Sequence, residues 1–424
     1  MSGPITDVGP PGGRTAARVS PLLVVGLFMV ALLGQFTFDR IGVERFGELD
    51  PRLVVFPVLA AAVLLWRFQP DLRDYRHDWP RSTVLAVALT GFLALSAFWA
   101  QLDARVGDSL ADLAYLGLLI VLAAVVSAPD PARARRLVLI LMLLAALAYT
   151  AAGLVVGDTN VQGRTTAFAG GPNVYARVVL LGVVAAAALA VIYRRAWLLL
   201  AVPFLAAAAL LPASRGAVLA GLLTVLLFGV LTWRRWTPRG AGVSMLLAAG
   251  TVLVARTLVP PAAAEVARTR FVELFEERVL SGRPELFAQA WSIFLEDPLL
   301  GAGVDGFYVL YGASVNLQYP HNLVLELAVT GGVIAVVLFL LFLAALVRDT
   351  RRQRPLTVDQ FAMLISAGFV GAASLFSGGI YDTRFFWVFV ALAVNHPAVR
   401  AGAGSGRADD RAPSELVSGV GDRR

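Results

Sequence analysis

Histidine and arginine supply the catalytic chemistry that this sequence offers, since it contains no cysteine for a thiol nucleophile or a thiolate metal site. His321 follows Tyr319-Pro320 directly before a long apolar run. At the start of a helix, the positive end of the helix dipole favours the neutral imidazole that a general base needs. His321 is therefore a candidate general base, and the alternative is a histidine that only anchors the chain by hydrogen bonds.

Two arginines stand at turns where each could bind an anion. Arg215 lies in a Ser-Arg-Gly turn between two apolar runs, and Arg283 directly precedes a proline at the start of a helical pattern. A guanidinium beside a helix N-terminus forms an anion site, because the side chain and the free backbone N–H groups carry positive charge to the same place. The alternatives are a snorkelling Arg215 and an ion pair of Arg283 with Glu285.

Together, one base and two anion-binding arginines fit attack by a hydroxyl on a sugar whose leaving group is an anionic, lipid-borne pyrophosphate. The base would accept the hydroxyl proton, and the arginines would stabilise the charge that builds on the departing phosphate. This scheme requires no metal and no cofactor, and the acidic residues show no metal-ligand spacing.

A third polar patch precedes the apolar run at 174–193. Asn173 and Arg177 are four residues apart and would share one helix face, with Arg164 in the preceding turn. The sequence predicts that this face lines a substrate cavity, and the alternative is an ordinary Gly-Pro turn with a capped helix.

The composition places these residues in a membrane protein. Hydrophobic residues make up 58% of the 424, and only 15% are charged. Runs of about 20 apolar residues are long enough to cross the hydrocarbon core of a bilayer as helices. The net charge of +7 fits arginines that collect on the cytoplasmic side, so no nucleic-acid partner is expected.

The pattern of apolar runs predicts an all-α, polytopic integral membrane protein with about twelve transmembrane helices. The arginine distribution predicts a multi-pass protein of the inner (cytoplasmic) membrane, with both termini in the cytoplasm. One large extracytoplasmic loop between spans nine and ten is patterned as two amphipathic helices, over Ala263–Leu280 and from Pro284 to Pro298. The predicted organisation is a disordered leader at 1–20, spans one to nine at 21–260, the loop at 261–320, spans ten to twelve at 321–400 and a disordered tail at 401–424.

The twelve expected spans follow the apolar runs and set which connections lie outside. They are expected at 21–37, 52–67, 83–100, 110–127, 137–156, 174–193, 197–212, 216–232, 243–260, 321–347, 359–377 and 384–397.

Several short motifs, in this order, resemble the O-antigen ligase and O-antigen polymerase superfamily of bacterial polytopic membrane glycosyltransferases. They are the Gly-Arg stretch and Pro-Asn within Arg164–Ala176, Ser-Arg-Gly-Ala at 214–217, Gly-Arg at 282–283 with Trp291, Asp-Pro-Leu-Leu-Gly-Ala-Gly at 297–303, and His321-Asn322 followed by Glu326 and Thr-Gly-Gly at 330–332.

The resemblance implies a metal-independent glycosyltransferase that uses an undecaprenyl-pyrophosphate-linked glycan as donor on the outer face of the cytoplasmic membrane. The functional residues of such proteins correspond here to Arg215, Arg283 and His321. The acceptor would be a glycan, a lipid or a protein. The sequence departs from the pattern at Gly171, where a polar residue is expected before Pro-Asn, and this departure concerns the contacts to the donor sugar.

Asn322 and Glu326 complete the expected substrate-binding set with Arg164, Asn173 and Arg177. Glu326 is five residues after His321, about 140° around an ideal helix, so it is not expected to orient the imidazole.

Two other functions stay open. A peptidoglycan polymerase of the shape and division family also uses a polyprenyl donor, but it relies on an outward-facing aspartate in a large loop, for which the sequence offers no clear counterpart. A transporter or flippase of lipid-linked sugars would place ionisable residues near mid-membrane and show repeated halves, and neither feature is evident.

Overall fold

The computed structural model describes residues 19–34, 50–69, 72, 75–76, 78–157, 159–160, 162–168, 170–232, 237–275, 283–315, 317–396 and 399–400. The expected leader, apart from its last two residues, and the expected tail at 401–424 lie outside these ranges.

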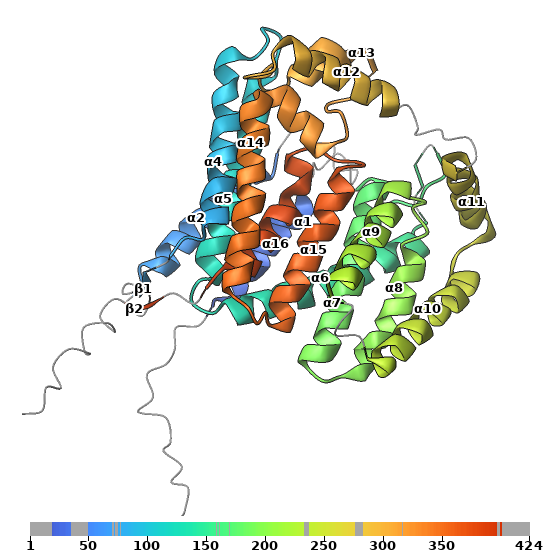
Figure 1. Ribbon diagram of the computed structural model, residues 1–424. Coiled ribbons are helices and arrows are strands. Elements are labelled where there is room, and N and C mark those ends of the chain that lie inside the picture. The colour runs from blue at the N-terminus through green and yellow to red at the C-terminus, as the bar shows by residue number, and fades with distance from the viewer. Residues whose placement is uncertain are drawn as a thin grey trace, which may run out of the picture.

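The described part of the chain is helical, as predicted, apart from isolated bridges and a two-residue antiparallel pair of β1 (Tyr75–Arg76) with β2 (Val399–Arg400) (Figure 1). The helices are α1 (Pro21–Leu33), α2 (Arg52–Arg67), α4 (Arg81–Leu95) with η3 (Ser96–Trp99), α5 (Val106–Ser127), α6 (Pro131–Val155), α7 (Pro172–Ile192), η4 (Ala196–Leu200), α8 (Ala201–Ala208), α9 (Arg215–Thr232), α10 (Pro238–Leu258), α11 (Pro261–Phe275), α12 (Arg283–Glu296), η6 (Tyr308–Gly312), α13 (Ala313–Val315), α14 (Leu323–Arg352), α15 (Val358–Ser374), η7 (Tyr381–Thr383) and α16 (Arg384–Val394).

Each expected span coincides with a helix, but the helices differ in length. Within the described ranges, six are long and apolar enough to cross a membrane: α4 with η3, α5, α6, α7, α10 and α14. Four shorter apolar helices, α1, η4 with α8, α9 and α15, coincide with further expected spans. The protein is therefore a multi-pass membrane protein, and the number of about twelve crossings stays a prediction.

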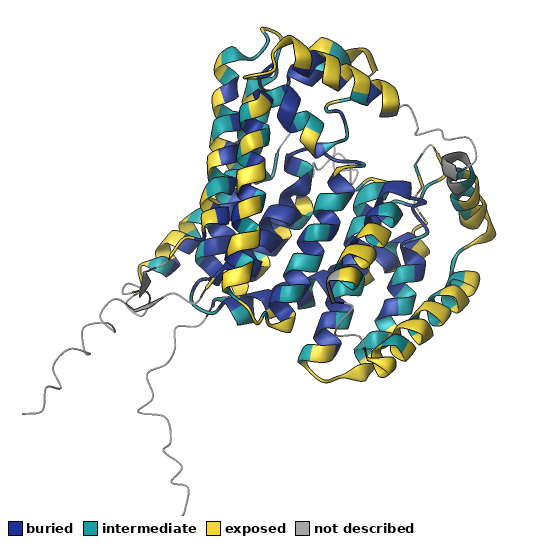
Figure 2. Ribbon diagram, in the orientation of Figure 1, coloured by how far each residue is buried: buried dark blue, intermediate teal, exposed yellow. Residues whose placement is uncertain are grey.

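Helix α16 forms the centre of the bundle. All of its residues are buried, as expected for a helix that is apolar on every side (Figure 2). Its Trp387 packs against Phe342 of α14, with ring centroids 5.0 Å apart. At 11 residues it is about 16 Å long, about half the hydrocarbon thickness, so α16 is a core helix shorter than the expected span at 384–397.

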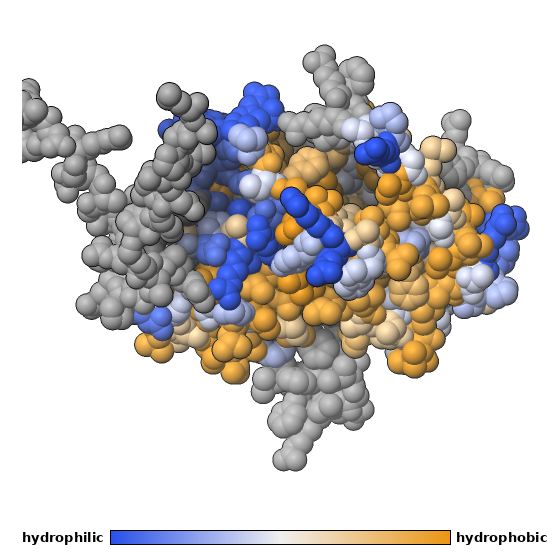
Figure 3. Space-filling model, turned by 90° about the horizontal axis from the view of Figure 1, so that it is seen from below, coloured by the Kyte–Doolittle hydropathy of each residue, from blue (hydrophilic) through white to orange (hydrophobic). Residues whose placement is uncertain are grey.

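The connections between helices gather at two opposite ends of the bundle. At one end, Arg135 of α6 forms an ion pair with Asp359 of α15, with 2.6 Å between Nε and Oδ2. At the other end, Arg105 binds Asp305 and Asn173 binds Ser377. Which of the two ends faces the cytoplasm stays a prediction. Figure 3 shows the molecule from the lower side of Figure 1. Hydrophobic residues cover much of this face, and hydrophilic residues gather in the middle of it.

Helix α14 contains a break that a neighbouring loop fills. Gly332 leaves the helical conformation at φ 61° and ψ −158°. The break frees the Val329 carbonyl, which accepts a hydrogen bond from the Ala302 N–H at 2.7 Å, and the Val333 N–H, which donates to the Pro298 carbonyl at 2.8 Å. The Asp-Pro-Leu-Leu-Gly-Ala-Gly motif therefore satisfies the backbone groups that the kink leaves open.

The large loop contains the two expected amphipathic helices. Helix α12 begins at Arg283, as predicted, and buries Leu286, Ala290 and Ile293 in a small core against the start of α14. Helix α11 ends at Phe275, and the remainder of the predicted Ala263–Leu280 helix, 276–280, lies outside the described residues. Figure 1 shows α12 across the top of the bundle and α11 at its side.

Candidate functional site

A cavity of about 740 Å³ opens at the end of the bundle where α7 begins. We call it the amphipathic cavity, because its two parts differ in chemistry. The polar part is lined by Asn173, Arg177, His321, Asp382 and Arg384, and the apolar part by side chains of α1 and α6 that include Phe28, Met29, Leu33, Leu141 and Leu144. Its shape and chemistry suit a ligand with a polar head and a hydrocarbon tail.

Asn173 joins three segments of the chain at the polar part. Its Oδ1 accepts hydrogen bonds from Ser214 Oγ at 2.8 Å and from Arg164 Nη2 at 3.1 Å. Its Nδ2 donates to Ser377 Oγ at 2.8 Å. Pro172 occupies the first turn of α7, where a missing backbone N–H costs nothing, and this places Asn173 at the helix start.

Arg177 lies one turn further along α7 and also lines the cavity, which confirms that it shares a face with Asn173. Its guanidinium donates to the backbone carbonyls of Ser377 and, at 3.4 Å, Ala373. Gly378 makes this approach feasible, because a Cβ there would lie 3.1 Å from Arg177 Nη1 and its φ is +104°.

Arg164 contacts the amphipathic cavity through Asn173. Besides its bond to Asn173, its Nε donates to the Pro212 carbonyl at 2.9 Å, and it is not among the residues that line the cavity. Arg164 therefore holds Asn173, the residue that the sequence predicts to bind substrate.

Arg215 begins α9 and is buried, with 8% of its surface exposed. Its Nη1 donates to the Arg270 carbonyl of α11 at 3.1 Å, so it links α9 to the large loop. It is not among the residues that line the amphipathic cavity, although Ser214 beside it bonds to Asn173. Arg283 starts α12, but its side chain lies outside the described residues.

His321 lies at the polar part of the cavity in a left-handed backbone conformation, with φ +57°. This conformation is uncommon for residues other than glycine and occurs where the surrounding structure imposes it. The imidazole contacts the Tyr319 ring edge to face, with centroids 4.8 Å apart. The residue precedes the helix cap, so the expected span beginning at 321 starts two residues too early.

Asn322 caps α14, and its expected role in substrate binding stays a prediction. Its Oδ1 accepts hydrogen bonds from the backbone N–H groups of Val324 at 3.0 Å and Leu325 at 3.1 Å, and its Nδ2 donates to the Leu375 carbonyl at 3.1 Å. The Asn322 amide therefore fixes the start of α14 to the end of α15.

Tyr319 and Asp382 form a pair that sequence reasoning missed as a site. The phenol donates a hydrogen bond to Asp382 Oδ2, which also accepts from the Gly379 N–H at 3.4 Å. Burial, reinforced by the Asp382 charge, raises the pKa of Tyr319 well above its usual value, so the phenol keeps its proton. The two residues come from connections 63 positions apart, and no local spacing links them.

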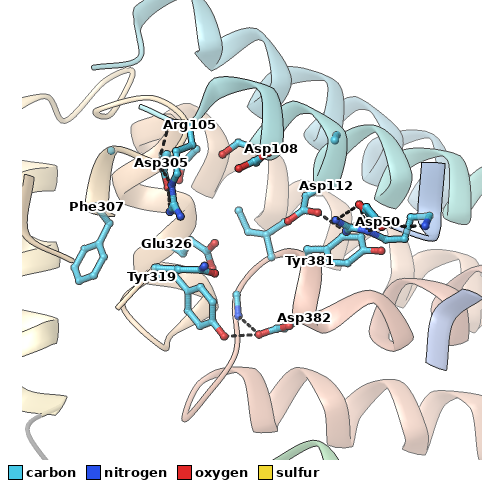
Figure 4. A pocket seen from close by; sticks show the side chains of 18 residues that line it. Asp50, Arg105, Asp108, Asp112, Asp305, Phe307, Tyr319, Glu326, Tyr381 and Asp382 are labelled. Carbon is cyan, nitrogen blue, oxygen red and sulfur yellow. Dashed lines mark hydrogen bonds and ion pairs between the residues drawn. The ribbon is translucent and has the colours of Figure 1, made fainter. Parts of the chain in front are cut away.

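A second, polar cavity of about 360 Å³ lies on the other side of this pair. We call it the acidic cavity, because six carboxyl groups line it: Asp50, Asp108, Asp112, Asp305, Glu326 and Asp382 (Figure 4). Tyr319 and Asp382 line both cavities and so form their shared wall. Glu326 also lines the acidic cavity, and its expected role in substrate binding stays a prediction.

Arg384 was also missed, because it reads as the start of an apolar run. Its guanidinium lines the amphipathic cavity, donates to the backbone carbonyl of Ala31 and lies 4.0 Å from Asp382 Oδ1. An arginine at the outer end of an apolar helix was the available signal. Among the described residues, no group of three or more His, Asp or Glu side chains is arranged to hold a metal ion.

Residues 200–340 match the O-antigen ligase family, a stretch of about a third of the chain that contains Arg215, Arg283 and His321. No curated protein matches the chain. The resemblance that the ordered motifs predict is thereby confirmed.

Proposed function

The chain carries the domain of the O-antigen ligase and polymerase type of membrane glycosyltransferase, and from this premise we propose its donor and its reaction. It transfers or polymerises glycan from an undecaprenyl-pyrophosphate donor onto an acceptor hydroxyl at the outer face of the cytoplasmic membrane. The acceptor is a glycan, a lipid or a protein, and no metal takes part. Both termini face the cytoplasm.

The observation that carries this proposal is the amphipathic cavity. Its apolar part, between α1 and α6, suits a polyprenyl chain, and the exposed hydrophobic side chains Met29 and Leu144 continue it toward the lipid. Its polar part presents the guanidinium groups of Arg177 and Arg384, which suit a pyrophosphate. A lipid-linked diphosphate has this division into an apolar chain and an anionic head.

Arg215 and Arg283 contribute from the connections around the cavity. In the proposed reaction they stabilise the pyrophosphate as it departs, with Arg215 at the start of α9 and Arg283 at the start of α12. Asn173 and Arg177 orient the donor head, and Arg164 holds Asn173 in place.

His321 acts as the general base. The acceptor oxygen attacks the anomeric carbon, a new C–O bond forms, and the bond from that carbon to the pyrophosphate oxygen breaks. The acceptor proton passes to the imidazole, and the bonding electrons leave with undecaprenyl pyrophosphate. General-base catalysis of this kind contributes roughly a hundred- to ten-thousand-fold in rate.

The experiment is mass spectrometry of the lipid-linked glycan pool in a deletion strain that expresses either wild type or His321→Ala at equal level. We expect pyrophosphate-linked intermediates to accumulate with His321→Ala as they do in the deletion, together with loss of a mature glycan. The matched control is His396→Ala, an exposed histidine at the opposite end of the bundle, which should restore the wild-type pool. Full complementation by His321→Ala would contradict the mechanism.

A further inference from the structure

The acidic cavity is separate from the space that holds the proposed donor, and its charge selects a different ligand. Six carboxyl groups line it, against the two arginines Arg52 and Arg105. Resting on the proposed function, we propose that this cavity binds the acceptor, and that the acceptor is a glycan without negative charge at its reacting end, either neutral or amine-bearing.

Both arginines are already engaged by carboxylates. Arg52 forms ion pairs with Asp50 and Asp112, and its guanidinium lies 5.0 Å from the ring centroid of Tyr381. Arg105 forms a bidentate ion pair with Asp305: Nε donates to Oδ2 at 2.9 Å, and Nη2 donates to Oδ1 at 2.9 Å. The arginines therefore hold the wall together and offer little attraction to an anionic ligand.

Two carboxyl groups remain for a ligand, on facing sides of the cavity (Figure 4). Asp108 lies in the first turn of α5 and is exposed. Glu326 accepts a hydrogen bond from the Ile380 N–H, while its Oε2 atom is buried without a hydrogen-bond partner among the described residues. A buried carboxyl oxygen without a hydrogen-bond partner is costly, and a ligand hydroxyl or amine group supplies that partner.

The chemistry of these groups defines the ligand class. Carboxylates only accept hydrogen bonds, so they suit the hydroxyl and amine groups of a sugar. Tyr381 also lines the cavity, with its ring beside the Arg52 guanidinium. A phosphorylated or carboxylated sugar would bring negative charge to a cavity where the described aspartates alone outnumber the arginines.

The shared wall links the cavity to the transfer reaction. Tyr319 and Asp382 border both cavities, and His321 contacts Tyr319 from the side of the amphipathic cavity. A sugar seated in the acidic cavity would place a hydroxyl at this wall, beside the donor head. The cavity lining contains no long apolar segment like that of α1 and α6, which argues that the sugar here is not the lipid-linked donor.

The test uses the full-length protein in lipid nanodiscs and three disaccharides: di-glucosamine, di-N-acetylglucosamine and di-N-acetylglucosamine 6-phosphate. Saturation-transfer NMR titrations measure the dissociation constants. We expect the first two to bind and the phosphorylated one to bind at least about tenfold more weakly. Equal or stronger binding of the phosphorylated sugar would overturn the proposal.

Two variants locate the site. Asp108→Asn should weaken di-glucosamine binding about tenfold, the loss expected for one charge-assisted hydrogen bond, and Glu326→Ala should weaken it as well, because it removes the buried carboxyl group. Asp103→Asn is the matched control, since Asp103 is exposed in the connection just before α5 but does not line the cavity. Because Asp108 is exposed, its variant should fold normally, and unchanged binding to Asp108→Asn, or an equal loss in Asp103→Asn, would contradict the site.

A parallel titration with undecaprenyl pyrophosphate separates this proposal from the proposed function. Asp108→Asn should bind this lipid as wild type does. If the lipid fails to bind while the sugars behave as expected, the proposed function fails and the glycan site stands. If the lipid binds and all three sugars fail, the proposed function stands and the acceptor site is refuted.

Discussion

Asn173 Nδ2 donates a hydrogen bond to Ser377 Oγ at 2.8 Å, and this bond joins the start of α7 to the connection after α15. The same side chain accepts a hydrogen bond from Ser214 just before α9, so one amide fixes three of the connections around the amphipathic cavity. The position of the polar part of the cavity therefore depends on a network and not on a single helix.

Replacing Asn173 by alanine should lower both stability and activity. Up to three partners lose their hydrogen bonds, and leaving buried groups unsatisfied costs about 1–3 kcal/mol each. Thermal unfolding of the detergent-solubilised protein should show a lower midpoint, and transfer activity should fall further than stability explains. Gln162→Ala, which removes an exposed side chain bonded to Arg270, is the control and should leave both nearly unchanged. An unaltered midpoint in Asn173→Ala would show that the network is not stabilising.

Replacing Gly332 by alanine should prevent normal folding. A Cβ at this position would lie 2.2 Å from the Leu299 carbonyl oxygen, and φ +61° with ψ −158° is a conformation that essentially only glycine adopts. We expect a loss of about 3 kcal/mol or more, measured as a lower unfolding midpoint or as loss of folded protein. The control is Gly242→Ala on α10, where a Cβ meets open space and alanine favours the helix. Wild-type stability of Gly332→Ala would contradict the described packing of 297–303 on the kink.

The helices could be predicted from the sequence because the apolar runs carry most of the information about a membrane bundle. Asn173 and Arg177 could also be placed on one face, since residues four apart in a helix are neighbours. The lengths were less predictable. Helix α16 ends at Val394, because Asn395 adopts an extended conformation, and the apolar run alone does not distinguish a buried helix from a membrane-spanning one.

The wall of the site could not be predicted, because tertiary packing creates it. Tyr319 and Asp382 meet only when two connections converge. Gly301 is needed because it packs against the backbone at the kink of α14, which the sequence does not reveal. Asn322 caps α14, a role that its place directly before the apolar run could have predicted, since asparagine is a strong N-cap. His321 was placed at the outer end of α14, and the structure puts it at the polar part of the cavity.

Replacing Tyr319 by phenylalanine should impair transfer and change the response of stability to alkaline pH. The pKa of Tyr319 is raised in the folded protein, so above its ordinary value of about 10 the unfolded chain releases a proton that the folded chain keeps. Stability from this group is therefore complete below about pH 10 and declines as pH rises further. Unfolding midpoints between pH 8 and 11 should fall less steeply for Tyr319→Phe than for wild type.

The same substitution removes the hydrogen bond to Asp382, which should lower transfer activity at neutral pH about tenfold through misplacement of the wall. Tyr193→Phe is the control, since Tyr193 lies at the opposite end of the bundle, after α7, and is not part of either cavity. Wild-type activity of Tyr319→Phe would show that the phenol does not position the reacting groups.

Replacing Ala148 by tryptophan should obstruct the apolar part of the amphipathic cavity and raise the KM for the lipid donor. Ala148 is exposed on α6 and lines this part, so an indole would occupy space meant for the polyprenyl chain without disturbing the core. Leu147→Trp adds the same ring one position away, where the exposed side chain does not line the cavity, and should leave the KM unchanged. The comparison uses donors with long and short prenyl chains. The KM should rise several-fold for the long chain and less for the short one, since the short chain buries less apolar surface. An equal rise for both chains would place the obstruction at the pyrophosphate instead of at the hydrocarbon tail.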